Sequence, residues 1–70
     1  MEWVPSPESS NIVRFGYEAA NQELFVEFKR GGVYQYFDVP QTIFDQMKAA
    51  PSKGSFLAQM VKGRYRYARM

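Results

Sequence analysis

Apolar and polar residues alternate with a period of two through the first half of the chain, and the apolar residues take up helical spacing after Pro40. The alternation predicts three strands, over Asn11–Tyr17, over Glu23–Lys29 and between Gly32 and Pro40. Short segments rich in glycine, asparagine or other polar residues join these strands, as in antiparallel hairpins. The sequence therefore predicts an antiparallel meander before Pro40.

The third strand is predicted to lie at the centre of the domain, because apolar runs precede and follow it. Tyr34 and Tyr36 are two residues apart and therefore point to one side of the strand. Val33, Phe37 and Val39 point to the other side. We expect Tyr36 to be more buried than Tyr34, because Tyr34 lies nearer the glycine turn.

The hairpin at Arg30-Gly31-Gly32 is compatible with two registers. A two-residue loop pairs Leu24 and Val26 with the apolar side of the third strand, whereas a three-residue loop pairs them with the tyrosines. A slip of one residue exchanges the two faces, and the sequence leaves both registers open. We favour the two-residue loop, because it leaves Gln35 as the only polar residue on the inner face.

Two short helices are predicted after the third strand. The first begins at Pro40 and is stopped by Pro51, while the second has Ser52 as its N-cap and ends near Gly63. Each carries an apolar stripe that would face the sheet. The expected core includes Phe28, Phe37, Phe44, Phe56, Leu57 and Met60.

The predicted fold class is α+β, with a three-stranded antiparallel meander followed by two short helices on one sheet face. The C-terminal segment Arg64–Arg69 is extended and is compatible with an additional C-terminal strand. Residues 1–70 are expected to form one domain, in which residues 1–9 form an irregular N-terminal arm. Trp3 is expected to pack back from this arm onto the domain.

The chain contains no cysteine and no histidine, which excludes disulfides, thiol nucleophiles, imidazole bases and the usual zinc sites. It also lacks a glycine-rich phosphate-binding motif. We therefore expect a protein that is not an enzyme and has no cofactor. No apolar run reaches membrane-spanning length, and the first residues do not resemble a signal peptide. A cytoplasmic monomer with no membrane partner is the expectation.

The formal net charge is only +2, but the charges are unevenly distributed. The segment Lys53–Met70 contains five cations and no acid, whereas the preceding residues are acidic overall. Such asymmetry favours a polyanionic partner. Lys53 stands among serines at the start of the second helix, where these groups could hold a phosphate, but capping alone explains Ser52 and is the interpretation that we favour.

The tyrosine pair and the basic C-terminal segment form the candidate site. Tyrosine rings on a strand can stack on unpaired bases, and cations beside them can contact phosphates. The candidate nucleic-acid-binding residues are Tyr34, Tyr36, Lys53, Lys62, Arg64, Tyr65, Arg66 and Tyr67. Alternatively, the tyrosines pack under a helix and the cations form a solvated sheet edge. An exposed aromatic patch would also suit a protein partner, as in an interaction or accessory domain.

Short motifs along the chain, in the same order, resemble those of the KTSC domain, a small bacterial domain named for the C-terminus of some lysyl-tRNA synthetases. They are Ser9-Ser10-Asn11-Ile12, Phe28, Tyr34-Gln35-Tyr36, Val39-Pro40, Ser52-Lys53-Gly54-Ser55 and Arg64-Tyr65-Arg66-Tyr67. The resemblance implies no established activity. It implies RNA binding only through the association of the domain with the synthetase.

Overall fold

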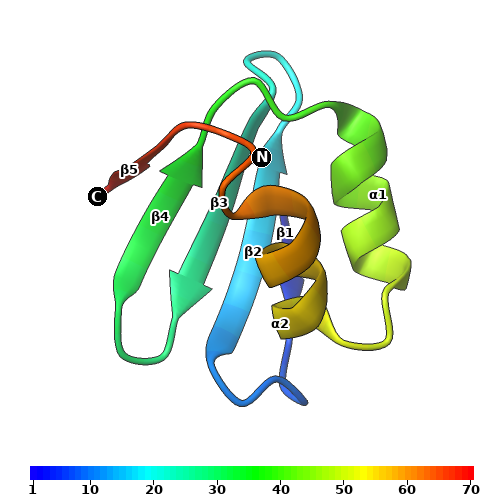
Figure 1. Cartoon of the computed structure of the whole chain (residues 1–70), viewed down its shortest axis with the longest axis vertical. Coiled ribbons are helices and arrows are strands. Elements are labelled where there is room, and N and C mark those ends of the chain that lie inside the picture. Colours follow the sequence, from blue (N-terminus) through cyan, green and yellow to red (C-terminus); the bar gives the residue numbers. More distant parts are fainter.

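The computed structural model describes residues 1–70, and its centre is a five-stranded antiparallel sheet whose strands follow one another in chain order (Figure 1). The strands are β1 (Glu2–Pro5), β2 (Ile12–Glu18), β3 (Glu23–Phe28), β4 (Gly32–Tyr36) and β5 (Tyr67–Arg69). Between β4 and β5 the chain forms α1 (Gln41–Ala49), α2 (Lys53–Phe56) and the π-helical turn η1 (Leu57–Val61). The predicted α+β class is confirmed, but the predicted three-stranded meander is wrong in lacking β1.

The helices cover only part of the sheet. In Figure 1, α1 lies at the β1 side of the sheet and α2 lies in front of β2. Leu24, Val26 and Tyr36 are still buried in the core, so the uncovered part of this face is β5 and the hairpin end of β3 and β4. Strand β5 is the additional C-terminal strand that the sequence left open. Its ends are fixed to β4 by hydrogen bonds from Phe37 N to Arg66 O and from Met70 N to Val33 O, of 2.9 and 2.8 Å.

Strand β1 replaces the irregular arm that was expected over residues 1–9. Trp3 pairs with Gly16 across the β1–β2 ladder, and its ring packs on Phe25 with a centroid distance of 6.3 Å. The Arg14 guanidinium lies 4.1 Å from the centroid of the same ring. A Cβ on Gly16 would stand 2.8 Å from the indole, so the glycine makes room for it. This long-range contact holds the arm in the sheet.

The register of β3 with β4 is the one that we did not favour. Leu24 pairs with Tyr36, Val26 with Tyr34 and Phe28 with Gly32, which leaves a three-residue loop. Gly32 has a φ of 75°, as is usual for the residue that follows a turn in a three-residue hairpin. The tyrosines therefore share the helix side of the sheet with the core residues, and the two-residue loop was wrong.

The core lies between the helices and the sheet. Its largest fully buried side chains are Phe15, Phe44, Ile12, Leu24, Met47, Leu57, Val26, Val39 and Val61. Val39 reaches it although the alternation placed it on the other face, because the chain leaves β4 after Tyr36 and turns at Asp38, whose φ is 58°. The Tyr17 hydroxyl donates a hydrogen bond to the Val39 carbonyl and fixes this return.

Two of the six expected core residues, Phe44 and Leu57, are fully buried. Phe28, Phe56 and Met60 are partly buried and pack against the core. The sixth, Phe37, is partly exposed and lies outside the core cluster. None of the helices has the length and apolar character required to cross a membrane.

We predict that Phe44→Ala lowers the free energy of unfolding by about 3–5 kcal/mol, enough to unfold much of so small a domain. The Phe44 ring is fully buried, stacks on Tyr17 at 5.1 Å and meets Phe15 edge-on at 5.8 Å. Phe56→Ala is the matched control and should cost less, because its ring is only partly buried. Urea denaturation measures both. Equal losses would show that the core is misplaced.

We also predict that Gly16→Ala destabilises the domain by about 1–3 kcal/mol, because the new methyl overlaps the Trp3 ring. The double variant with Trp3→Ala should lose less than the sum of the two single losses. Thermal melting of the four proteins of this cycle measures the coupling. Additive losses would mean that Trp3 does not pack on Gly16.

Candidate nucleic-acid interface

Four aromatic rings lie on the part of the helix-side sheet face that no helix covers. Phe28 meets Tyr34 edge-on, with ring centroids 5.3 Å apart. Tyr67 stacks on Tyr34 at 5.6 Å and lies tilted against Tyr36 at 5.8 Å. We call Phe28, Tyr34, Tyr36 and Tyr67 the tyrosine platform. It is assembled from β3, β4 and β5, so it depends on the observed register.

Exposure increases outward across the platform. Tyr36 is 2% exposed, Tyr34 is half-buried and Tyr67 is 62% exposed. The expectation that Tyr36 is more buried than Tyr34 is confirmed. Tyr36 therefore belongs to the core, while Tyr34 and Tyr67 present ring surface to solvent.

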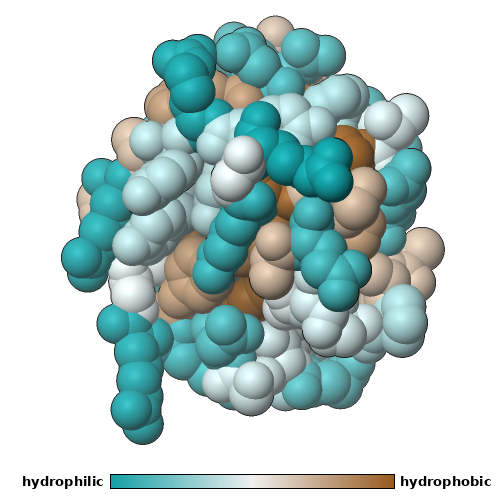
Figure 2. Space-filling view, in the orientation of Figure 1, coloured by the Kyte–Doolittle hydropathy of each residue, from teal (hydrophilic) through white to brown (hydrophobic).

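A hollow of about 500 Å³ opens over the inner part of the platform. Its floor contains Phe28, Tyr34 and Tyr36, and Lys29, Arg30 and Lys62 stand around it. We call it the hairpin groove, because Lys29 and Arg30 belong to the β3–β4 hairpin. Figure 2 shows apolar surface over β3, bordered by hydrophilic side chains. No acidic residue lines this groove.

The positive charge of the groove is not neutralised within the molecule. Three cations form salt bridges: Arg14 with Glu27, Lys48 with Glu2 and Asp45, and Arg66 with Asp38. Four of the others border the platform: Lys29, Arg30, Lys62 and Arg69. Lys62 Nζ lies 5.4 Å from the centroid of the Phe28 ring, and Arg69 stands opposite Tyr34 in the β4–β5 ladder. Lys29 Nζ donates to the Ser9 carbonyl at 2.9 Å, so Arg30, Lys62 and Arg69 are the cations most available to an anionic ligand.

The structure divides the eight residues that the sequence singled out. Tyr34, Tyr36 and Lys62 line the hairpin groove, and Tyr67 stacks beside them. The other four lie elsewhere: Lys53, Arg64, Tyr65 and Arg66.

Lys53 lies apart from the platform. Its ammonium group donates to the carbonyls of Lys48 and Ala50, at the end of α1, so it acts as a structural cap. Ser52 Oγ accepts a hydrogen bond from Ser55 N, as an N-cap does. The phosphate site considered for this segment therefore has its main cation already engaged.

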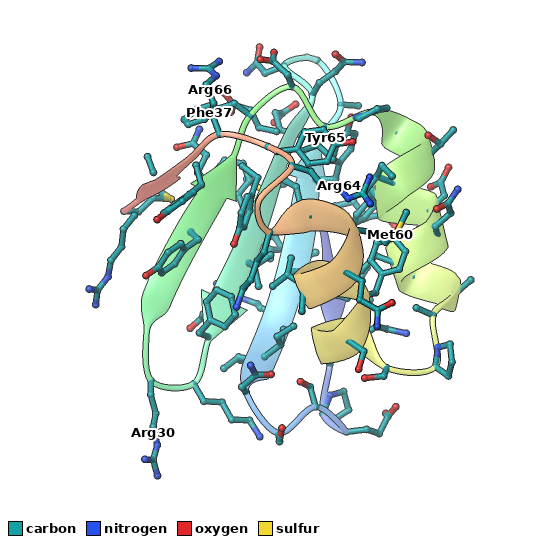
Figure 3. The ribbon with its side chains drawn as sticks, viewed as in Figure 1. Arg30, Phe37, Met60, Arg64, Tyr65 and Arg66 are labelled. Carbon is teal, nitrogen blue, oxygen red and sulfur yellow. The ribbon has the colours of Figure 1, made fainter.

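Arg64, Tyr65 and Arg66 lie in the segment that leads from η1 to β5. With Phe37, Gly63 and Tyr67 they line a second, shallow hollow of about 570 Å³. We call it the distal hollow. Arg66 and Phe37 lie at one end of β4, and Arg30 lies at the other end (Figure 3).

Sequence reasoning missed Phe28, Lys29, Arg30 and Arg69. Phe28 was assigned to the core, and the hairpin cations were not connected with the tyrosines. In the favoured register the tyrosines faced away from the helices, so Lys62 and the hairpin did not form one groove with them. The available signal was the pair of cations that stands directly before two glycines, Lys29-Arg30-Gly31-Gly32.

Burial raises the pKa of the Tyr36 phenol above its usual value near 10, and the neighbouring Tyr34 and Tyr67 phenols raise it further. The Tyr36 ring therefore stays uncharged at neutral pH. No group of three or more Asp, Glu, His or Cys side chains is placed to hold a metal ion. The arrangement offers stacking surface and positive charge, which are binding functions.

Comparison with known proteins agrees with this architecture. The KTSC domain model matches residues 8–65. The chain belongs to the KTSC domain family. A KTSC domain protein from Yersinia pestis has a crystal structure that superimposes with a TM-score of 0.93 at 32% sequence identity, covering 99% of this chain and 96% of the other.

Two kinds of relative share this KTSC domain. The lysine–tRNA ligase of Trichormus variabilis is 41% identical over 64 residues, which cover 91% of this chain and 11% of the ligase. The chain thus spans about one ninth of the length of that relative. A protein from Tsukamurella paurometabola is 44% identical over 59 residues, covering 84% of this chain and 88% of that protein. The domain therefore occurs both within a large ligase and in a chain of about its own length.

The raised pKa of Tyr36 predicts a loss of stability in alkali. Since the unfolded chain releases this proton at lower pH than the folded chain, the free energy of unfolding should fall as the pH rises above about 10. Tyr36→Phe keeps the ring and removes the titrating group, so its stability should fall less steeply. Urea denaturation across this range measures both slopes. Identical slopes would contradict the prediction.

Proposed function

We propose that this KTSC domain binds single-stranded nucleic acid, RNA in particular, on the tyrosine platform. The observation that carries the proposal is the coincidence of exposed rings with cations that have no acidic partner. Tyr34 and Tyr67 offer stacking surface, while Lys29, Arg30, Lys62 and Arg69 border the same face. Aromatic platforms flanked by positive charge are the usual means of binding unpaired bases and their phosphates.

The relatives support RNA as the first ligand to test. The lysine–tRNA ligases that contain a homologous region act, by their names, on a tRNA. A region that holds unpaired nucleotides would be useful in such an enzyme. In this chain the same platform would offer a site for unpaired nucleotides.

A second candidate is a protein-interaction or accessory domain. It is favoured by the sheet face opposite the helices, where Trp3 and Phe25 lie together beside Arg14. Phe25 is buried, with only 8% of its surface exposed. The salt bridge between Arg14 and Glu27 neutralises the charge beside it. That face offers little free apolar surface, so we place nucleic-acid binding first.

The test separates ring stacking from packing. Tyr67→Ala should weaken binding of a fluorescent single-stranded RNA by about 1–3 kcal/mol, with little loss of stability, because the ring is 62% exposed. Tyr67→Phe keeps the ring and should bind nearly as the parent does. Anisotropy titrations measure the binding, and thermal melts measure the stability, of the parent, Tyr67→Ala and Tyr67→Phe. Equal binding by all three would remove Tyr67 from the site.

Salt dependence supplies the charge control for the same experiment. Lys62→Gln should flatten the dependence of affinity on salt by about 0.7 in log–log slope, the amount expected for one lost phosphate contact with a single strand. Lys48→Gln removes the same charge from α1, where Lys48 pairs with Glu2 and Asp45, and should leave the slope unchanged. No binding to RNA or single-stranded DNA at low salt would refute the proposed function.

A further inference from the structure

The distal hollow repeats the chemistry of the hairpin groove at the other end of β4. It combines the rings of Phe37, Tyr65 and Tyr67 with two guanidinium groups, those of Arg64 and Arg66. The Arg66 guanidinium lies 5.4 Å from the centroid of the Phe37 ring. Rings and cations thus occur together twice on this small domain, and the platform alone does not explain the second occurrence.

The cations of the distal hollow can exchange partners. Arg66 pairs with Asp38 at 3.1 Å, but both side chains are more than three-quarters exposed. Such exposed pairs contribute little and are screened by salt, so a phosphate can replace the carboxylate. Arg64 uses Nε to donate to Gln59 O at 3.2 Å, which leaves its terminal nitrogens for another acceptor.

Tyr67 joins the two hollows. It lines the distal hollow, and it also stacks on Tyr34 and lies against Tyr36, both of which line the hairpin groove. Figure 3 places Arg30 at the hairpin end of β4 and Arg66 at the opposite end. A ligand that followed β4 and β5 would pass from one hollow to the other over the Tyr67 ring.

We propose that the two hollows are successive subsites of one track, which holds about four or five nucleotides of a single strand. This inference rests on the proposed function. The five residues of β4 span about 17 Å at the usual rise of a strand. Nucleotides stacked as in a helix rise about 3.4 Å each, so about five cover that distance, and a more extended strand needs fewer.

The experiment uses oligouridylates of two, five and ten nucleotides and follows the amide resonances of the isotope-labelled protein. The dinucleotide should shift resonances around the hairpin groove only. The pentanucleotide should bind about tenfold more tightly or better, because it adds stacked bases, and should also shift Gly63 to Arg66. The ten-nucleotide strand should gain only the small factor that comes from additional binding positions.

Arg66→Gln is the matched variant, since it loses only an exposed ion pair and should melt as the parent does. It should weaken the pentanucleotide several-fold and leave the dinucleotide unchanged. Equal affinity for two and five nucleotides, or equal weakening of both by the variant, would overturn the track while leaving the proposed function intact. Absence of binding at every length would instead refute the proposed function.

Discussion

The pairing of Phe28 with Gly32 is the constraint on which the rest of this domain depends. It sets the length of the hairpin loop and hence the face to which every side chain of β4 points. A slip by one residue would turn Tyr34 and Tyr36 away from the helices and bring Val33 and Gln35 inward. Gly32 permits this pairing, because its positive φ suits glycine and little else. One backbone conformation thus decides both the core and the platform.

The helices are too short to cover the whole sheet, and this leaves part of one face open. Phe44, Met47, Leu57 and Val61 bury themselves against β2 and the inner parts of β3 and β4. The chain then has only a short segment before β5, and β5 is added on the side away from the helices. Three strands therefore present rings on the part of this face that no helix covers.

The sequence predicted local structure well and long-range structure poorly. Both helices, their proline and serine boundaries, and β2, β3 and β4 follow from residue spacing alone. Strand β1 does not, because it depends on Trp3 finding the space above Gly16, and the prolines around it point to an irregular arm. The register failed because two adjacent glycines permit both loops. The observed three-residue loop is favoured by the packing of the tyrosine rings, and this long-range contact cannot be read from the alternation of apolar and polar residues.

The candidate site was predicted only in part, because it too depends on the register of β3 with β4. Tyr34, Tyr36, Lys62 and Tyr67 were recognisable as residue types, but their partners in the hairpin come into reach only through the correct register. Lys53 lies apart from the platform, and a lysine next to a helix end is as well suited to capping carbonyls as to binding phosphate. Net charge was similarly uninformative. Most of the acids pair with cations elsewhere or lie away from the groove, so a chain with a formal charge of only +2 has a strongly basic platform. What a polyanion meets is this local charge, since at physiological salt the field of more distant carboxylates is screened beyond about 8 Å.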